Sequence, residues 1–226
     1  MWRSNPTWGS PRIVGERHKI GIEVAKSTVE KYRPHIRKPP SPTWKALLNN
    51  HVKDLVSCDF FTVPTATFRG LFVFIILAHD RRRIVDCNIT EHPTAQWTAQ
   101  KIIDAFPWDT APRYLLRDRD SIYGEPFQQR VGNMGIEEVK IAPCSPWQSS
   151  YAERLIDSVR RECLNDVIVL NEQHLRRVLH SYVNYYHNWR VHRSLEMDAP
   201  EPRVVQPAEL GPVRKLPEVG GVAPSL

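Results

Sequence analysis

Cysteine is scarce in this chain, and its arrangement excludes two common kinds of stabilisation. The 226 residues include 4 cysteines, and no two of them form a C-x-x-C pair. The sequence therefore predicts neither a disulfide framework nor a zinc site. A long apolar run is also missing, because no segment stays apolar over the roughly 18–20 residues that a membrane span needs. The first residues do not resemble a secretory signal either. We expect a protein of the reducing cytoplasm that makes no membrane contact.

Acidic residues are few at the beginning of the chain. Residues 1–57 contain 11 lysines and arginines but 4 acidic residues, whereas the remainder contains 20 basic and 21 acidic residues. The net charge of +6 therefore resides in the first quarter of the sequence. A basic segment attracts the phosphate backbone of nucleic acids without reading its sequence. Residues 1–57 are a candidate DNA contact, and a solvated basic tail is the alternative.

Three carboxylates stand in settings that set them apart from the other acidic residues. Asp59 and Asp118 each follow an apolar run of the β type, and Glu153 opens a helical pattern. Strand ends and a helix can bring such acids together. Ligand sets that offer only oxygen suit Mg²⁺ or Mn²⁺, and two such ions activate a water or a 3′-hydroxyl and stabilise the leaving oxygen of a phosphodiester. The triad therefore predicts metal-dependent cutting and joining of DNA, with the three acids as catalytic residues and metal ligands.

Six short sequence motifs occur in the same order, and at a similar spacing, as in one protein family. They are Ser57–Phe61, Ala78–Arg83, Arg117–Gly124, Ser145–Gln148, Tyr151–Arg154 and Arg160–Leu164. Together they resemble the integrase catalytic core of bacterial insertion-sequence (D,D,E) transposases, which are relatives of retroviral integrases. The resemblance runs from about residue 50 to residue 200. Glu153 follows Asp118 by 35 positions, which agrees with the short second interval of that superfamily.

The resemblance implies a cofactor, partners and a set of DNA contacts. The cofactor would be Mg²⁺ or Mn²⁺, as two ions, and the partners would be DNA at the element ends and target, together with further copies of the chain. A bacterial cytoplasmic protein associated with the nucleoid is expected. The residues that we expect to contact nucleic acid are Arg119, Gln148, Ser149, Arg154, Arg160 and Arg161.

Asp120 competes with Asp118 for the second catalytic position, because both follow the same predicted strand. Asp118 directly ends the apolar run. In the transposases that this sequence resembles, the position of Asp120 is often glycine, which is consistent with a turn that needs no ligand there. We therefore assign Asp118.

The order of the elements indicates the fold class. Strands are predicted over residues 55–63, 70–78, 81–90 and 114–117, with a helix over 94–105 that has Pro93 in its first turn. Three strands followed by alternating helix and strand give an α/β fold. By resemblance it is a ribonuclease-H-like integrase core, with a mixed five-stranded sheet flanked by helices and an N-terminal helix-turn-helix remnant.

Two later helices have clear apolar faces. In the helix that carries Glu153, one face is expected to pack on the sheet, while Glu153, Asp157 and Arg160 share another stripe. That packing face consists of Ala152, Leu155, Ile156, Val159 and Cys163. A second helix begins after the N-cap Asn171. Its stripe is expected to pack against the same core and consists of Leu175, Val178, Leu179, Tyr182, Val183 and Tyr186.

Composition divides the chain into four parts. Residues 1–33 are predicted to form a partial helix-turn-helix-like DNA-binding segment, with a capping box from Ser27 to Glu30. Residues 34–49 are a basic, proline-rich linker, residues 50–200 the catalytic core with its C-terminal helix, and residues 201–226 a flexible tail.

One position departs from the family pattern. The resembling transposases commonly have asparagine after a Trp-Gln pair, but here Trp147 and Gln148 are followed by Ser149. Serine still caps a helix and hydrogen-bonds phosphate, but it has no amide group. Trp147 either stacks on a splayed base or anchors its loop.

We therefore expect a polynucleotidyl transferase of the transposase or integrase type. A metal-dependent nuclease on the same fold is one alternative. The other is an inactive, truncated remnant that acts only in DNA binding or assembly.

Overall fold

The computed structural model describes residues 10–32, 42–107, 109–142, 145, 148–204, 216–218 and 223–225. The chain divides into two compact units, Met1–Ser41 and Pro42–Leu226. The first unit contains helices α1 (Ser10–Lys19) and α2 (Lys26–Lys31), which pack together and bury Ile13 and Val29.

The predicted capping box at Ser27 is wrong. Helix α2 begins before Ser27, because Ala25 takes the extended backbone of an N-cap, with φ −68° and ψ 148°. The Ala25 carbonyl accepts hydrogen bonds from the backbone N–H groups of Thr28 and Val29, and no side chain caps the helix. Ser27 and Glu30 therefore both lie inside the helix.

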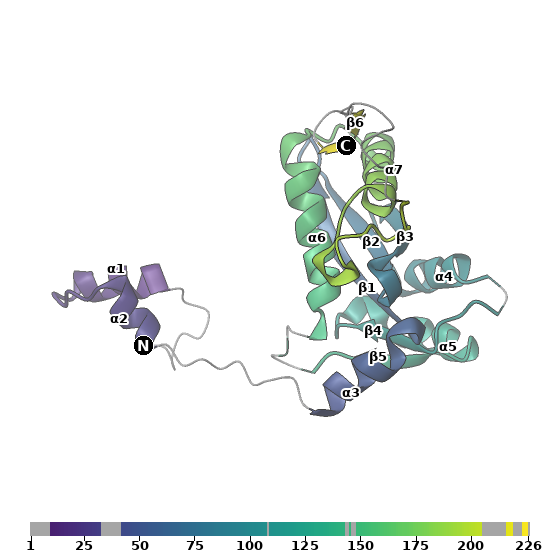
Figure 1. Ribbon diagram of the computed structural model, residues 1–226, viewed down its shortest axis with the longest axis horizontal. Helices are drawn as coiled ribbons and strands as arrows, with labels where there is room; N and C mark the ends of the chain where they lie inside the picture. Colours follow the sequence, from purple (N-terminus) through teal and green to yellow (C-terminus); the bar gives the residue numbers. More distant parts are fainter. Residues whose placement is uncertain are drawn as a thin grey trace. The chain divides into compact units, whose positions relative to one another are not determined.

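A mixed five-stranded sheet forms the centre of the second unit, as predicted (Figure 1). Its strands are β1 (Leu55–Pro64), β2 (Gly70–Ala78), β3 (Ile84–Thr90), β4 (Tyr114–Arg117) and β5 (Glu137–Lys140). Their order across the sheet is β3-β2-β1-β4-β5. The first three form an antiparallel meander, whereas β4 runs parallel to both β1 and β5. Arg81 and Arg82, predicted as the start of the third strand, instead lie in the 3₁₀ turn η2 (Asp80–Arg82).

Helices cover both faces of this sheet. They are α3 (Pro42–His51), α4 (Ala95–Ala105), α5 (Glu125–Asn133), α6 (Ser150–Glu162) and α7 (Glu172–Asn188). Short 3₁₀ turns lie at Val52–Asp54, Ser121–Tyr123, Leu164–Asp166 and Arg193–Leu195. Successive side chains of a strand point to opposite faces. Accordingly Val56 and Cys58 of β1 pack with α4 and α5, whereas Phe61 and Val63 pack with α6 and α7.

The two predicted amphipathic helices pack as expected. All five residues of the predicted packing face of α6 are buried. In α7, Leu175, Leu179, Tyr182 and Tyr186 are buried in the same cluster. The Asn171 side chain accepts a hydrogen bond from the backbone N–H of His174, which confirms it as the N-cap. Both helices therefore attach to the same face of the sheet.

Three predicted boundaries need correction. The linker predicted over residues 34–49 is wrong in its second half, because Pro42 begins α3, where a proline costs little in the first turn. Trp44, Leu47 and Leu48 then recur on one side of α3 and pack on Leu55. Pro93 lies outside α4, since the N-cap is Thr94.

The end of the chain also differs from the predicted tail. Two short antiparallel strands, β6 (Leu216–Glu218) and β7 (Ala223–Ser225), lie within residues 201–226. Along the described part of the chain, no helix combines the length and the apolarity required to cross a membrane.

The packing of α5 gives a stability prediction. Phe127 is fully buried among residues of α4, β1 and β4, so Phe127→Ala is expected to lower the free energy of unfolding by about 3–5 kcal/mol. Gln129→Ala on the exposed side of the same helix is the control. Urea unfolding of both variants measures the difference. A loss in Phe127→Ala no larger than that of the control would contradict this packing.

Candidate functional site

The pairing of two strands sets the first two carboxylates side by side. Strand β4 runs parallel to β1, with Ser57 opposite Leu116. Continuing that register by two residues places Asp118, the first residue after β4, across from Asp59. Because side chains alternate along a strand, both acids follow Ser57 and Leu116 onto the sheet face that α6 covers. Asp59 is partly buried and Asp118 is exposed.

Helix α6 adds the third carboxylate. Its buried face fixes the helix on the sheet, and Glu153 lies in its first turn, exposed and off that face. A cavity of about 320 Å³ is lined by Asp59, Asp118 and Glu153, together with Ile141, Ala142, Ser145 and Ser149. Three segments that are far apart in the sequence therefore contribute one acid each to the same cavity.

The acids share the cavity without meeting at one point. Within the described ranges, no three His, Cys, Asp or Glu side chains lie close enough together to surround one metal ion. The donor set nevertheless has the oxygen-only chemistry that Mg²⁺ and Mn²⁺ prefer. A cation would also relieve the repulsion among three carboxylates. The three carboxylates are therefore suitable ligands for a divalent ion by their chemistry.

Burial and carboxylate repulsion both act on Asp59. Burial, together with the charges of Asp118, Glu153 and Asp120, raises the pKa of Asp59 to about 6, although the backbone N–H of Phe60 donates a 2.8 Å hydrogen bond to its carboxylate. Burial and the neighbouring Asp157 also raise the pKa of Glu153. The site therefore disfavours its own negative charge while it holds no cation.

The structure gives Asp118 and Asp120 different positions. Asp118 lines the cavity and accepts a 3.1 Å hydrogen bond from the backbone N–H of Asp120. Asp120 does not line the cavity; it caps the 3₁₀ turn η3 (Ser121–Tyr123) by accepting a hydrogen bond from the Ile122 N–H. This placement favours Asp118 as the ligand.

Arg117 is a feature of the site that sequence reasoning missed. Its side chain is almost fully buried, pairs with Glu138 of β5 and lies 5.1 Å from the ring centroid of Tyr123. One of its N–H groups donates a 2.9 Å hydrogen bond to the carbonyl of Asp118. Arg117 therefore anchors the turn that carries Asp118. The signal in the sequence was an arginine that ends an apolar strand, because an arginine buried there needs several polar partners.

The residues predicted to contact nucleic acid occupy three places. Ser149 lines the carboxylate cavity, while the Gln148 side chain accepts a hydrogen bond from Ala142 N–H and Arg119 donates to the Ile141 carbonyl. The Gln148 bond connects the loop before α6 to the segment after β5, and the Arg119 bond connects the turn after β4 to that same segment. The arginines of α6 lie elsewhere: Arg160 lies over Phe61, and Arg154 and Arg161 line a different cavity. Trp147 lies outside the described residues.

The amino-acid sequence is similar to one protein family and to one protein of an insertion element. Residues 134–200 match the integrase core domain family. Over 173 residues the chain is 24% identical to an uncharacterized 39.2 kDa protein of insertion element IS476 from Xanthomonas euvesicatoria. That alignment covers 76% of this chain and 50% of the relative, so the chain spans about half the length of the curated protein that it matches.

Solved structures show the same fold at low sequence identity. The catalytic domain of Mos1 mariner transposase matches with a TM-score of 0.53 and 12% identity, covering 63% of this chain and 78% of that domain. A simian T-cell lymphotropic virus intasome chain matches with a TM-score of 0.53 and 10% identity, covering 72% and 61%. The HTLV-2 integrase catalytic core, in a complex with magnesium, gives a TM-score of 0.50 at 10% identity, covering 66% and 93%.

The raised pKa of Asp59 leads to a prediction about stability. An acid whose pKa is higher in the folded state costs nothing below its unfolded pKa, destabilises the fold increasingly as the pH rises toward the folded pKa, and has its full effect above that value. Asp59→Asn is therefore expected to stabilise the metal-free protein by about 1–3 kcal/mol at pH 8. The gain should vanish below about pH 4.

Thermal unfolding in EDTA at both pH values provides the measurement. Thr62→Ser, in the same strand outside the cavity, serves as the control. An equal change at both pH values in Asp59→Asn would show that packing, rather than charge, is responsible.

Proposed function

The chain carries an integrase core of the kind found in insertion-sequence transposases, and from this premise we propose that it is a DNA transposase. It would cleave DNA strands at the ends of a mobile element and join them to target DNA. The cavity lined by Asp59, Asp118 and Glu153 is the observation that carries this proposal.

The three carboxylates would hold divalent metal. Asp59 of β1 and Asp118, the residue after β4, line the same cavity and would hold one ion, and Glu153 with either of them a second. Bound Mg²⁺ or Mn²⁺ would supply a Lewis acid for the phosphodiester and lower the pKa of an attacking water. We propose that water is the first nucleophile and that a DNA 3′-hydroxyl attacks later.

The protein's own groups would position the DNA and the acids. The Arg117 side chain donates a hydrogen bond to the backbone carbonyl of Asp118 and so positions that acid. The buried face of α6 positions Glu153. Ser149, the N-cap residue of α6, lines the cavity, and its side chain makes no capping hydrogen bond. Catalysis of this kind depends mainly on positioning and on charge neutralisation.

DNA would reach the site through basic segments outside it. The first unit contributes basic residues at the end of α1, namely Arg17, His18 and Lys19. We propose that this unit contributes to DNA binding, and that further copies of the chain assemble on the DNA. The protein would act at the bacterial nucleoid.

Single substitutions in the cavity test the catalytic assignment. Asp59→Asn, Asp118→Asn and Glu153→Gln are each expected to reduce Mg²⁺-dependent DNA strand cleavage at least a hundredfold (about 2.7 kcal/mol). Asp120→Asn is the matched control, because asparagine can still cap η3, and it should retain cleavage. A gel assay on labelled DNA measures the cleaved strand, and circular dichroism verifies the fold.

The outcomes separate the alternatives. Activity retained in Asp118→Asn and lost in Asp120→Asn would move the ligand role to Asp120. Cleavage without strand-transfer products would indicate a nuclease. DNA binding by the wild-type chain with no cleavage in Mg²⁺ or Mn²⁺ would leave a DNA-binding protein and refute the proposed activity.

The serine before α6 gives a separate prediction. Ser149→Asn restores the amide that the related transposases carry beside this glutamate. A group that positions the reacting DNA acts chiefly in the transition state, so we expect the cleavage rate to rise several-fold with little change in DNA affinity. Rates and dissociation constants measured at one salt concentration decide it. A gain in affinity without a gain in rate would oppose this role for residue 149.

A further inference from the structure

A second cavity lies on another face of α6. It has a volume of about 200 Å³ and is lined by residues of α6, of the turn η2 and of the segment that follows α7, together with Leu77 of β2 and Tyr186 of α7. Arg154, Ser158 and Arg161 of α6 line it, and their spacing of four and three residues places them on one side of the helix. Glu153 points to the carboxylate cavity from the neighbouring side. One helix therefore serves both cavities.

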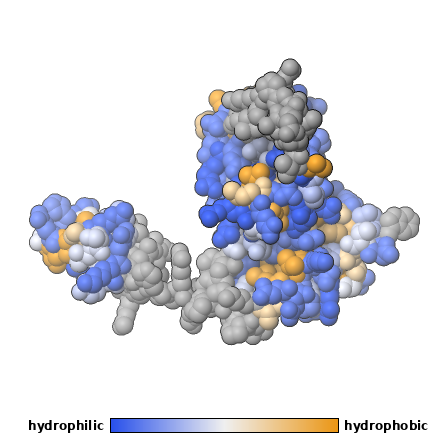
Figure 2. Space-filling model, in the orientation of Figure 1, coloured by the Kyte–Doolittle hydropathy of each residue, from blue (hydrophilic) through white to orange (hydrophobic). Residues whose placement is uncertain are grey.

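The lining of this second cavity is strongly positive. Arg82 and Arg190 join the two arginines of α6, and no carboxylate is among the described residues that line it. Arg190 pairs with Glu162 at 2.7 Å. In the part of the chain that the structure describes, neither Arg82, Arg154 nor Arg161 forms an ion pair with a carboxylate. We call this site the arginine cavity. Figure 2 shows that hydrophilic residues cover much of the visible surface of the second unit, with smaller hydrophobic patches among them.

The backbone is arranged to aim Arg82 at this cavity. Arg81 and Arg82 have φ values of +47° and +56°, a conformation that non-glycine residues rarely adopt. The Arg81 side chain secures it by donating to the carboxylate of Asp198 at 2.8 Å and to the carbonyls of Ala199 and Pro200, each at 2.7 Å. Strained backbone held in this way is typical of functional sites.

Two of the guanidinium groups are held in place before any ligand arrives. Arg82 lies 4.3 Å from the ring centroid of Tyr151, and Tyr151 packs in turn against the buried ring of His79. Arg190 donates to both carboxylate oxygens of Glu162 and to the hydroxyl of Ser158 at 3.1 Å. Such preorganisation reduces the entropy that is lost when an anion binds.

The chemistry of the lining selects a phosphate group. Guanidinium groups form bidentate hydrogen bonds that match phosphate oxygens. The Tyr151 ring already packs against Arg82 and His79, so the cavity recognises charge rather than offering an open ring for base stacking. A DNA strand presents one phosphate per ~3.4 Å, and Arg154 and Arg161 span about 10 Å along the helix. A strand bound at Glu153 therefore carries nearby phosphates past these arginines.

We propose that the arginine cavity binds a backbone phosphate of the DNA strand that passes the carboxylate cavity. This rests on the proposed function, since it assumes that DNA is the substrate. It assigns Arg82, Arg190 and Ser158 a part in DNA binding beyond the arginines of α6. Arg81 is a positioning residue, because it acts through the backbone of Arg82.

The test compares DNA affinity at several salt concentrations, in EDTA so that no strand is cut. The variants are Arg82→Gln, Arg154→Gln and their double. Because one phosphate meets both arginines, the double variant is expected to bind about tenfold more weakly and to lower the slope of log affinity against log salt by about 0.9. Its loss should be smaller than the sum of the two single losses. Two unrelated duplex sequences should respond equally.

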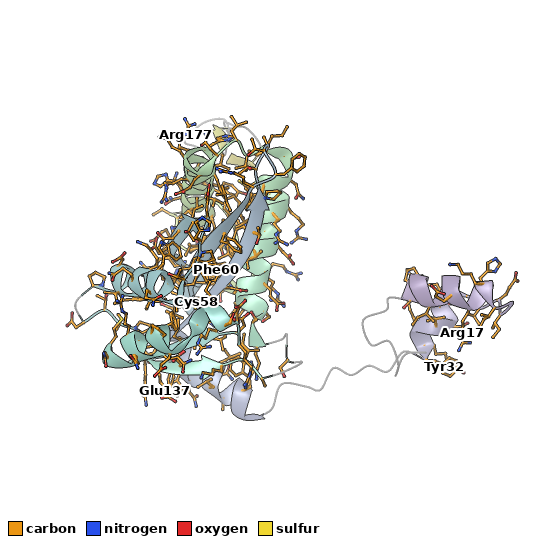
Figure 3. The ribbon with its side chains drawn as sticks, turned by 180° about the vertical axis from the view of Figure 1, so that it is seen from behind. Arg17, Tyr32, Cys58, Phe60, Glu137 and Arg177 are labelled. Carbon is orange, nitrogen blue, oxygen red and sulfur yellow. The ribbon has the colours of Figure 1, made fainter. Side chains whose placement is uncertain are left out.

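Arg177→Gln is the matched control. Arg177 is exposed on α7, does not line the cavity and loses the same charge on substitution (Figure 3). It should leave the slope unchanged. Thermal unfolding of every variant verifies that the fold persists. An equal slope in the wild type and the double variant would overturn the proposal, as would the same decrease in Arg177→Gln.

Inorganic phosphate distinguishes a DNA backbone from a free anion. At constant ionic strength, phosphate is expected to raise the melting temperature of the wild type more than that of the double variant. A phosphate effect without any change in the DNA salt slope would identify a site for small anions and overturn the DNA assignment.

The proposed transposase activity and the proposed phosphate site can be refuted independently of each other. Cleavage by the wild type with an unchanged slope in the double variant would refute the arginine cavity alone. A flattened slope, in a protein that cleaves no DNA, would refute the proposed activity alone.

Discussion

The parallel pairing of β1 with β4 is the constraint on which the site depends. A shift of one residue would turn every β4 side chain to the other face. The present register points Asp118 toward α6 beside Asp59, and it points Arg117 toward Tyr123 and α5, where the arginine is buried. The two positions are linked, because the buried arginine holds the turn that carries the exposed acid. Misregister would bury Asp118 and expose Arg117, so burial and charge both favour the observed pairing.

Helix α6 must satisfy three demands with 13 residues. Its apolar stripe attaches it to the sheet, its acidic stripe contributes Glu153, and its third stripe contributes Arg154 and Arg161 to the arginine cavity. Helical periodicity keeps these stripes apart while adjacent residues stay close. The buried stripe therefore orients both functional stripes, and a change in its packing would move the two cavities together.

Local patterns predicted the elements well where a single signal dominated. The strand predicted over residues 70–78 is β2, Asn171 predicted the start of α7, and helical periodicity predicted the buried face of α6. Prediction failed where signals competed or where distant contacts decided. The segment that begins at Pro42 is helical because Trp44 packs in the core with Leu55 and Leu116. The turn at Arg81 depends on Asp198, which lies 117 residues away, and no local pattern contains that contact.

The two cavities oppose each other electrostatically along one helix. Burial and the charges of Asp118 and Glu153 raise the pKa of Asp59, and the acidic cavity would repel a phosphodiester. Arg82, Arg154 and Arg161, which form no ion pair with a carboxylate among the described residues, would attract it. Without cations, a strand would therefore be held at the arginines and kept away from the acids. Neutralising the acids removes the repulsion and leaves the attraction unchanged. Since Glu153 and Arg154 are adjacent, this change would occur within a single turn of α6, and under the proposed function it would link DNA approach to metal occupancy without a movement of the backbone.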